Sequence, residues 1–234
     1  MARDISLQLY LFVAGYIMEH IGNGIMIYKL RKQKSMYGIS IDTQLCLLAS
    51  TIARVMWMFD TQLTRLWISV IEIITAVIMH GYIVYLCYQY KDTIYKGVSA
   101  IYLKFYVLIG ACFLLSMIFH PGNKGDYFLT FQMFVSFTMF LEAVALIPQL
   151  VHLRQNRDPE GLTSQYLYCL GASRGVRFFF WIAMVTNNDS FWYLILADLV
   201  HTVMLIGFFY QYHLAKKSGG PILAFSDKQH GKDF

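Results

Sequence analysis

The chain has 234 residues, of which 57% are hydrophobic and 14% are charged, and its formal net charge is +5. Soluble domains carry roughly a quarter charged residues, so this composition excludes an ordinary soluble domain and indicates a membrane protein. The positive charge is informative through its placement along the chain, and it does not indicate affinity for nucleic acid.

Apolar segments long enough to cross a bilayer follow one another along nearly the whole chain. A spanning helix needs about 20 predominantly apolar residues. The sequence predicts seven such helices, at about residues 7–29, 43–59, 67–89, 98–119, 127–151, 164–184 and 192–214. We therefore expect an all-α membrane protein with a seven-helix domain over residues 1–214 and a cytosolic tail over residues 215–234.

Lysines and arginines are distributed unevenly between the two ends of these helices. Twelve follow the first, third, fifth or seventh segment: Lys29, Arg31, Lys32, Lys34, Lys91, Lys96, Arg154, Arg157, Lys216, Lys217, Lys228 and Lys232. The opposite side holds three, which are Arg3, Arg65 and Lys124. Because positive residues concentrate on the cytosolic side of membrane proteins, this bias predicts a lumenal or external N-terminus and a cytosolic C-terminus.

The chain contains an internal repeat with an offset of 123 residues. A forty-residue segment that starts at Glu19 aligns without a gap on the segment that starts at Glu142, and nine of the forty positions are identical. The identical pairs include Arg54 with Arg177, so charged residues match each other. The sequence therefore predicts two copies of one three-helix unit.

The two copies account for six of the seven predicted helices. The first copy covers about residues 7–89 and the second about residues 127–214, and the helix at about 98–119 links them. One linking helix makes both copies run in the same direction, which is the parallel repeat described for SWEET transporters and here predicts a SWEET-like or PQ-loop-like architecture. Ligand sites in such proteins lie at the repeat interface near the membrane midplane.

Ten ionisable residues lie inside the predicted helices, where each charge costs about 2.5–3.5 kcal/mol to insert. They are Glu19, His20, Arg54, Glu72, His80, Glu142, Arg174, Arg177, Asp198 and His201. Three arginines against Glu19 and Glu142 leave one positive charge over, which favours a polar cavity for an anionic ligand. The alternative reading is a set of internal ion pairs that lock the helices together.

Pro148 and Gln149 interrupt the apolar segment that carries Glu142. A proline inside a helix removes one backbone hydrogen bond and bends the helix, so we expect this helix to line the cavity and to flex. The sequence has no HExxH or CxxC motif, no histidine cluster with metal-ligand spacing and no nucleophile or phosphate-loop motif. We therefore expect no metal, no cofactor and no enzymatic activity.

Three segments resemble the KDEL receptor family, also called ER lumen protein-retaining receptors: FLEAVALIPQL (140–150), GLTSQYLYCLGASRGVRFFFWI (161–182) and GFFYQYHLAKK (207–217). The resemblance covers most of the chain and implies a seven-helix receptor of the ER and Golgi membranes. Such a receptor binds the C-terminal KDEL or HDEL tetrapeptide of soluble ER proteins in the acidic Golgi. It returns them to the ER in coatomer vesicles and releases them at neutral pH.

The resemblance also implies a set of ligand-binding residues, namely Arg54, Arg174, Arg177, Glu142, Gln132 and Trp181. Arg54 and Arg174 fall on family arginines that contact the ligand. Gln132 stands where the family has a ligand-contacting glutamate, and Arg177 stands where it has a tyrosine. Lys216 and Lys217 resemble the basic tail that engages coatomer.

The proton-sensing position departs from the family pattern. The family's pH-sensing histidine aligns with Glu19, and His20 lies one place along on another face of the helix. We hypothesise that Glu19 takes over the coupling to protons, so that Glu19→Gln would change the pH dependence of binding. The gain of Arg177 and the loss of family acceptors make the predicted cavity more positive, which suits a more acidic or altered peptide terminus.

Two other functions are compatible with the sequence. One is a PQ-loop or SWEET-like carrier of a small anionic or zwitterionic solute, which also needs a midplane site. The other is a relative of the receptors that keeps the fold and the trafficking but no longer binds a peptide. A receptor differs from a carrier in binding a protein terminus from the lumen and recruiting a coat.

Overall fold

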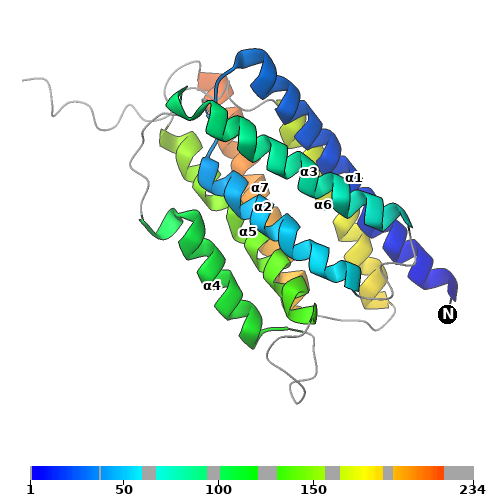
Figure 1. The fold of residues 1–234 in the computed structure, drawn as a ribbon. Helices are drawn as coiled ribbons and strands as arrows, with labels where there is room; N and C mark the ends of the chain where they lie inside the picture. The colour runs from blue at the N-terminus through cyan, green and yellow to red at the C-terminus, as the bar shows by residue number, and fades with distance from the viewer. Residues whose placement is uncertain are drawn as a thin grey trace, which may run out of the picture.

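The computed structural model describes residues 2–36, 38–59, 67–93, 101–120, 131–155, 164–186 and 192–218, and this part of the chain contains seven α-helices and no β-strand. The helices are α1 (Ala2–Gln33), α2 (Ile41–Val55), α3 (Trp67–Gln89), α4 (Phe105–Ile118), α5 (Phe131–Gln155), α6 (Ser164–Thr186) and α7 (Trp192–Ser218). They form one bundle with α4 on its outside (Figure 1). The seven predicted helices are thus confirmed as helices.

Three of the helices are long and apolar enough to cross a bilayer. These are the segments Trp67–Gln89, Gln132–His152 and Trp192–Leu214, which belong to α3, α5 and α7. The apolar helix α4 has 14 residues and is about 21 Å long at 1.5 Å per residue, whereas the prediction at this place was a full span over about 98–119. By length and composition the molecule is a helical membrane protein.

The start of α4 is set by a contact with another helix. Phe105 N donates a hydrogen bond to Asp42 Oδ1 at 3.1 Å, and Lys104 Nζ lies 3.5 Å from Asp42 Oδ2. Asp42 lies in the first turn of α2, whose own N-terminus is capped because Ser40 Oγ accepts from Thr43 N at 3.4 Å. The first turn of α2 therefore also fixes the start of α4.

The outward faces of the helices are apolar, and the ionisable side chains of the helices face inward among buried apolar residues. On α7, Leu199, Val203 and Ile206 are exposed, whereas Asp198 and His201 are buried. A soluble helix would instead expose its charged residues to water. The observed distribution is the one expected when hydrocarbon surrounds the bundle and ionisable groups face its interior.

The helices from the two halves of the chain pack against each other crosswise. The most extensive contacts join α1 to α6 and α2 to α5, while α6 and α7 touch only slightly. The contact between α1 and α6 is close because two glycines of α1 face α6: a Cβ on Gly15 would lie 3.3 Å from Arg177 Cγ, and one on Gly22 would lie 3.1 Å from Cys169 Cβ. Small residues at helix crossings allow such close approach.

Gln149, which follows Pro148 in α5, binds the connector between α1 and α2. The helix α5 continues through Pro148, and Gln149 makes two hydrogen bonds of 2.7 Å, accepting from Ser40 N at Oε1 and donating from Nε2 to Gly38 O. Gly38 has a φ of 81°, a backbone conformation that favours glycine. The buried amide of Gln149 thus satisfies the polar backbone of a turn.

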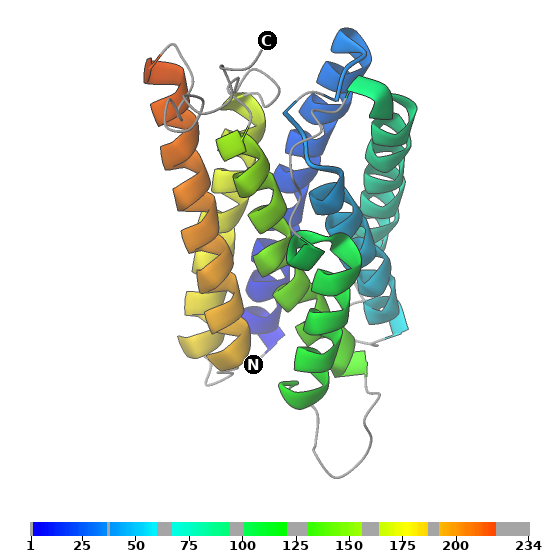
Figure 2. The same ribbon diagram turned by 90° about the vertical axis from the view of Figure 1, so that its left-hand side faces the viewer.

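Figure 2 shows α1 beginning at one end of the bundle and α7 ending at the other. Lys216 and Lys217 lie in the last turn of α7, and the structure describes their backbone but not their side chains. Six of the residues that entered the charge bias lie outside the described residues: Arg65, Lys96, Lys124, Arg157, Lys228 and Lys232.

Candidate functional site

Seven charged side chains from six helices meet inside the bundle, and we call them the charged cluster. Its members are Glu19 on α1, Arg54 on α2, Glu72 on α3, Glu142 on α5, Arg174 and Arg177 on α6, and Asp198 on α7. Each is at most 6% exposed. Buried charges persist in proteins where they are paired, so the pairings define what the site can do.

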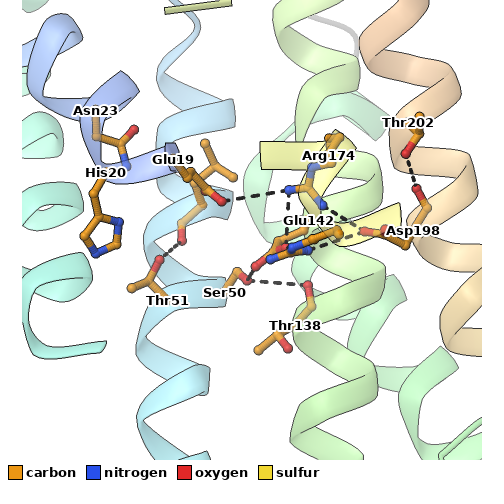
Figure 3. Close-up of polar contacts among 12 residues, drawn as sticks. Glu19, His20, Asn23, Ser50, Thr51, Thr138, Glu142, Arg174, Asp198 and Thr202 are labelled. Atoms are coloured by element: carbon orange, nitrogen blue, oxygen red, sulfur yellow. Dashed lines mark hydrogen bonds and ion pairs between the residues drawn. The ribbon is translucent and has the colours of Figure 1, made fainter. Parts of the chain in front are cut away.

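Arg174 and Arg177 share two carboxylates between them. Asp198 Oδ1 accepts hydrogen bonds from Arg174 Nη1 at 2.8 Å and from Arg177 Nη1 at 3.4 Å. Glu142 Oε2 accepts from Arg177 Nη1 at 2.9 Å and lies 3.7 Å from Arg174 Nη2. Glu19 Oε2 is more distant, at 3.9 Å from Arg174 Nη2. Figure 3 shows Arg174 between Glu19 on one side and Asp198 on the other.

Arg54 forms a separate pair on the other side of the cluster. Its Nη2 donates to both carboxylate oxygens of Glu72, at 2.7 and 2.6 Å. The Nε2 atom of His20 lies 3.5 Å from Glu72 Oε1 and 3.1 Å from the Glu72 carbonyl oxygen. The imidazole of His20 therefore contacts Glu72, whereas Glu19 contacts Arg174. The two predicted proton-sensing residues thus contact different halves of the cluster, which are the Arg54–Glu72 pair and the group around Arg174.

The ring of Tyr16 contacts both Arg54 and Arg177, and so connects the two halves of the cluster. The guanidinium carbon of Arg54 lies 3.5 Å from the ring centroid, and that of Arg177 lies 4.2 Å from it. Tyr16 is fully buried, and its hydroxyl has no hydrogen-bond partner among the described residues. Since Arg54 and Arg177 are equivalent positions of the internal repeat, this one aromatic ring makes a cation–π contact with an arginine from each copy.

The expected surplus of one positive charge is wrong. Glu72 pairs with Arg54, and Asp198 pairs with Arg174 and Arg177, so four carboxylates face three guanidinium groups in the described part of the chain. The cluster therefore carries one excess negative charge when all seven groups are ionised. The predicted preference for a more acidic ligand rested on the gain of Arg177 and the loss of family acceptors, and Arg177 is paired here with Glu142 and Asp198.

The remaining predicted ligand residues occupy different places. Trp181 contacts the cluster, since its Nε1 donates to Asp198 Oδ2 at 3.0 Å. Gln132 does not belong to it: the side chain is exposed in the first turn of α5, about 15 Å along the helix from Glu142 at 1.5 Å per residue. A ligand contact of Gln132 stays a prediction for the end of the bundle.

A groove of about 700 Å³ lies between α6 and α7. Its walls are apolar and include Phe178, Phe179, Ile182, Leu199 and Ile206. Arg174, Trp181 and Asp198 also line it, so the groove reaches the charged cluster. The groove exists because α6 and α7 scarcely contact each other.

Sequence reasoning identified Glu72 and Asp198 as buried ionisable residues but placed neither at the ligand site, and it missed Tyr16. Tyr16 precedes Glu19 by three residues, and this spacing places both on one face of α1. Among the described residues no group of three or more His, Cys, Asp or Glu side chains could hold a metal ion.

These features define a class: an all-helical membrane protein with a buried cluster of ion pairs shared between two halves of the chain. The model of the ER lumen protein retaining receptor family matches residues 35–184. That match spans more than half of the chain, and the chain belongs to this family.

Relatives from distant organisms match over most of their length. The ER lumen protein-retaining receptor of Dictyostelium discoideum is 29% identical over 205 residues, which are 86% of this chain and 93% of the relative. ER lumen protein-retaining receptor A of Arabidopsis thaliana is 30% identical over 210 residues, or 88% and 94% of the two chains. The similarity therefore covers most of the chain and is not confined to one motif.

Proposed function

We propose that this protein is a membrane receptor for C-terminal retention signals of the KDEL or HDEL type. It binds soluble ER proteins that carry such a signal in the Golgi and returns them to the ER by retrograde vesicle transport. The observation that carries this function is the family match, together with relatives over most of the chain that are named ER lumen protein-retaining receptors. The family is one of receptors, not enzymes, and the match does not favour the alternative of a solute carrier.

The proposed ligand site is the charged cluster. Arg54, Arg174 and Arg177 supply guanidinium groups, which bind carboxylates through paired hydrogen bonds. Trp181 supplies an indole N–H, and Glu142 orients Arg177 from 2.9 Å. Gln132 would contact the part of the peptide that lies nearer the end of the bundle.

The proposed architecture has seven membrane-spanning helices in two parallel three-helix repeats, α1–α3 and α5–α7, with α4 as the linker. The packing supports this arrangement, because the contact of α1 with α6 and that of α2 with α5 are exchanged by the 123-residue offset of the repeat. The domain boundaries stay at 1–214 for the membrane domain and 215–234 for the tail.

The N-terminus faces the lumen and the C-terminus the cytosol in this proposal, because the basic residues concentrate on one side. Lys216 and Lys217 then lie at the cytosolic end of α7, and coatomer is the partner that we propose for them. Glu19 and His20 are the proposed proton-sensing pair, since each contacts one half of the cluster and histidine changes charge between about pH 5 and 8.

Secretion of a soluble reporter that ends in a retention tetrapeptide tests this function. We expect cells that lack the protein to secrete the reporter, and the wild-type protein to restore its retention. Arg174→Ala should fail to restore it, while Arg31→Ala, an exposed arginine of α1, should restore it. Secretion that does not depend on the protein would contradict the proposed function.

A further inference from the structure

Asp198 is the only carboxylate among the described residues that is hydrogen-bonded to Arg174. Its Oδ1 atom lies 2.8 Å from Arg174 Nη1, whereas the nearest oxygens of Glu142 and Glu19 lie at 3.7 and 3.9 Å. Its Oδ2 atom accepts from Trp181 Nε1 at 3.0 Å. Both oxygens of one carboxylate are therefore engaged by side chains of α6 that the proposed function assigns to the ligand.

The carboxylate of Asp198 lies at the buried end of the groove between α6 and α7, whose exposed apolar walls face the hydrocarbon. Arg174, Trp181 and Asp198 all line the groove. The Glu72 carboxylate is buried to the same degree and hydrogen-bonded to Arg54, but Glu72 does not line this groove. Of these two paired carboxylates, the groove therefore reaches only that of Asp198.

A further carboxylate cannot simply be added to this site. Three guanidinium groups already face four carboxylates, so an additional anion would meet a cluster with an excess negative charge. Uncompensated charge at low exposure is costly. A carboxylate ligand of Arg174 must therefore replace an existing carboxylate or arrive together with a proton.

The geometry points to a carboxylate-binding subsite formed by Arg174, Arg177 and Trp181, with Asp198 as its internal occupant. The ligand class is a free carboxylate, and in the receptor it is the terminal carboxylate of the retention peptide, which displaces Asp198. The identity of this ligand rests on the proposed function, but the existence of the subsite does not. A peptide cannot bind at the subsite while Asp198 fills it. The apparent affinity for the peptide is therefore reduced in proportion to the fraction of time for which the subsite is vacant.

Rescue of a vacated subsite by acetate tests the subsite without any peptide. The midpoint of thermal unfolding is measured for the full-length wild type, Asp198→Ala and Glu72→Ala in detergent, in sodium acetate and in sodium chloride at equal ionic strength. Both variants should unfold at lower temperature than the wild type. We expect acetate to raise the midpoint of Asp198→Ala and to leave that of Glu72→Ala unchanged, and an equal shift in both variants would overturn the inference.

Peptide binding to Asp198→Asn tests the competition and does not depend on the folding of the alanine variant. The asparagine keeps the side-chain volume and removes the charge, so a peptide with a free terminal carboxylate should bind at least about tenfold more tightly than to the wild type. The matched control Asp42→Asn, at the contact between α2 and α4, should bind like the wild type. Unchanged or weaker binding to Asp198→Asn overturns the inference.

The two experiments separate failure of this inference from failure of the proposed function. If acetate rescues Asp198→Ala but no variant binds a retention peptide, the subsite stands and the receptor function fails. If the wild type binds the free-acid peptide, the amidated peptide does not bind, and Asp198→Asn shows no gain, the receptor function stands and the competition by Asp198 fails.

Discussion

One aromatic ring contacts two guanidinium groups in the charged cluster. The Tyr16 ring centroid lies 3.5 and 4.2 Å from the guanidinium carbons of Arg54 and Arg177. A desolvated cation above an aromatic face gains about 2 kcal/mol. The ring thus stabilises two like charges that would otherwise repel each other.

Two substitutions of Tyr16 distinguish the contribution of the ring to stability from that of the hydroxyl. Tyr16→Leu removes both cation contacts and leaves a cavity, so we expect a loss of at least about 2 kcal/mol in the free energy of unfolding. Tyr16→Phe keeps the ring and removes a hydroxyl without a hydrogen-bond partner in the described residues, so it should unfold like the wild type. Unfolding is measured in detergent, with Tyr10→Leu at an exposed position of α1 as the control. Equal stability of Tyr16→Leu and Tyr10→Leu would show that the ring contributes nothing.

Gln149 offers a second test at the residue scale. Gln149→Met keeps the size of the side chain but leaves Ser40 N and Gly38 O without the hydrogen bonds that Gln149 provides. A buried polar group without a partner costs about 1–3 kcal/mol, so the midpoint of thermal unfolding should fall clearly. Gln165→Met, at an exposed position of α6, should leave it unchanged. A midpoint for Gln149→Met equal to that of Gln165→Met would contradict this role.

The individual residues show how far sequence reasoning reaches. The spacing of Arg174 and Arg177 predicts correctly that they share a face, because helix geometry fixes which positions of one helix are neighbours. Their partner Asp198 lies on another helix, and spacing along one helix cannot say which helix it faces. The charge surplus was wrong for this reason. The contacts of Gln149 were not predicted either, because its hydrogen-bond partners lie 109 and 111 residues away along the chain.

At the scale of elements, the crossing of α1 and α6 depends on glycine. A Cβ on Gly22 would lie 3.1 Å from Cys169 Cβ, whereas one on Gly81 in α3 would meet nothing within 4 Å. Alanine is better than glycine in a helix by roughly 1 kcal/mol. The same substitution should therefore have opposite effects at these two positions.

We expect Gly81→Ala to raise the midpoint of thermal unfolding and Gly22→Ala to lower it. At Gly22 the added methyl group forces Cys169 or the helix backbone to shift, and overpacking of this kind costs typically about 1–3 kcal/mol. Unfolding of the two purified variants in detergent measures the difference. A stabilised Gly22→Ala would mean that α1 and α6 are not closely packed at this point.

Element boundaries follow from sequence where local apolar runs decide them. The predicted segments 67–89 and 164–184 agree with α3 and α6 to within a few residues, because each apolar run is bounded by polar residues. The prediction of 98–119 began too early, since α4 begins at Phe105, whose N–H is bound by Asp42. A cap supplied 63 residues away leaves no local signal in the sequence.

At the scale of the whole molecule, the proposed orientation places peptide binding on the lumenal side and coat recruitment on the cytosolic side. If Lys216 and Lys217 engage coatomer, the double variant Lys216→Ala, Lys217→Ala should lose coatomer binding while its peptide affinity stays unchanged. The lysines lie about 27 Å along α7 from Asp198 at 1.5 Å per residue. Coatomer binding to full-length protein in vesicles measures this, with Lys228→Ala, Lys232→Ala as the matched control. Equal loss in both double variants would indicate general attraction to positive charge.

The most direct test of the receptor function is peptide binding by the purified full-length protein. Peptides that end in KDEL, HDEL or a scrambled tetrapeptide are titrated at mildly acidic and at neutral pH, each with a free or an amidated C-terminus. We expect tight binding of the free-acid KDEL or HDEL peptide at acidic pH, weaker binding at neutral pH, and loss of binding in Arg54→Ala and Arg174→Ala. Absence of binding at both pH values in the wild type and in Asp198→Asn would contradict the receptor function. It would then leave a family member that keeps the fold without recognising this signal.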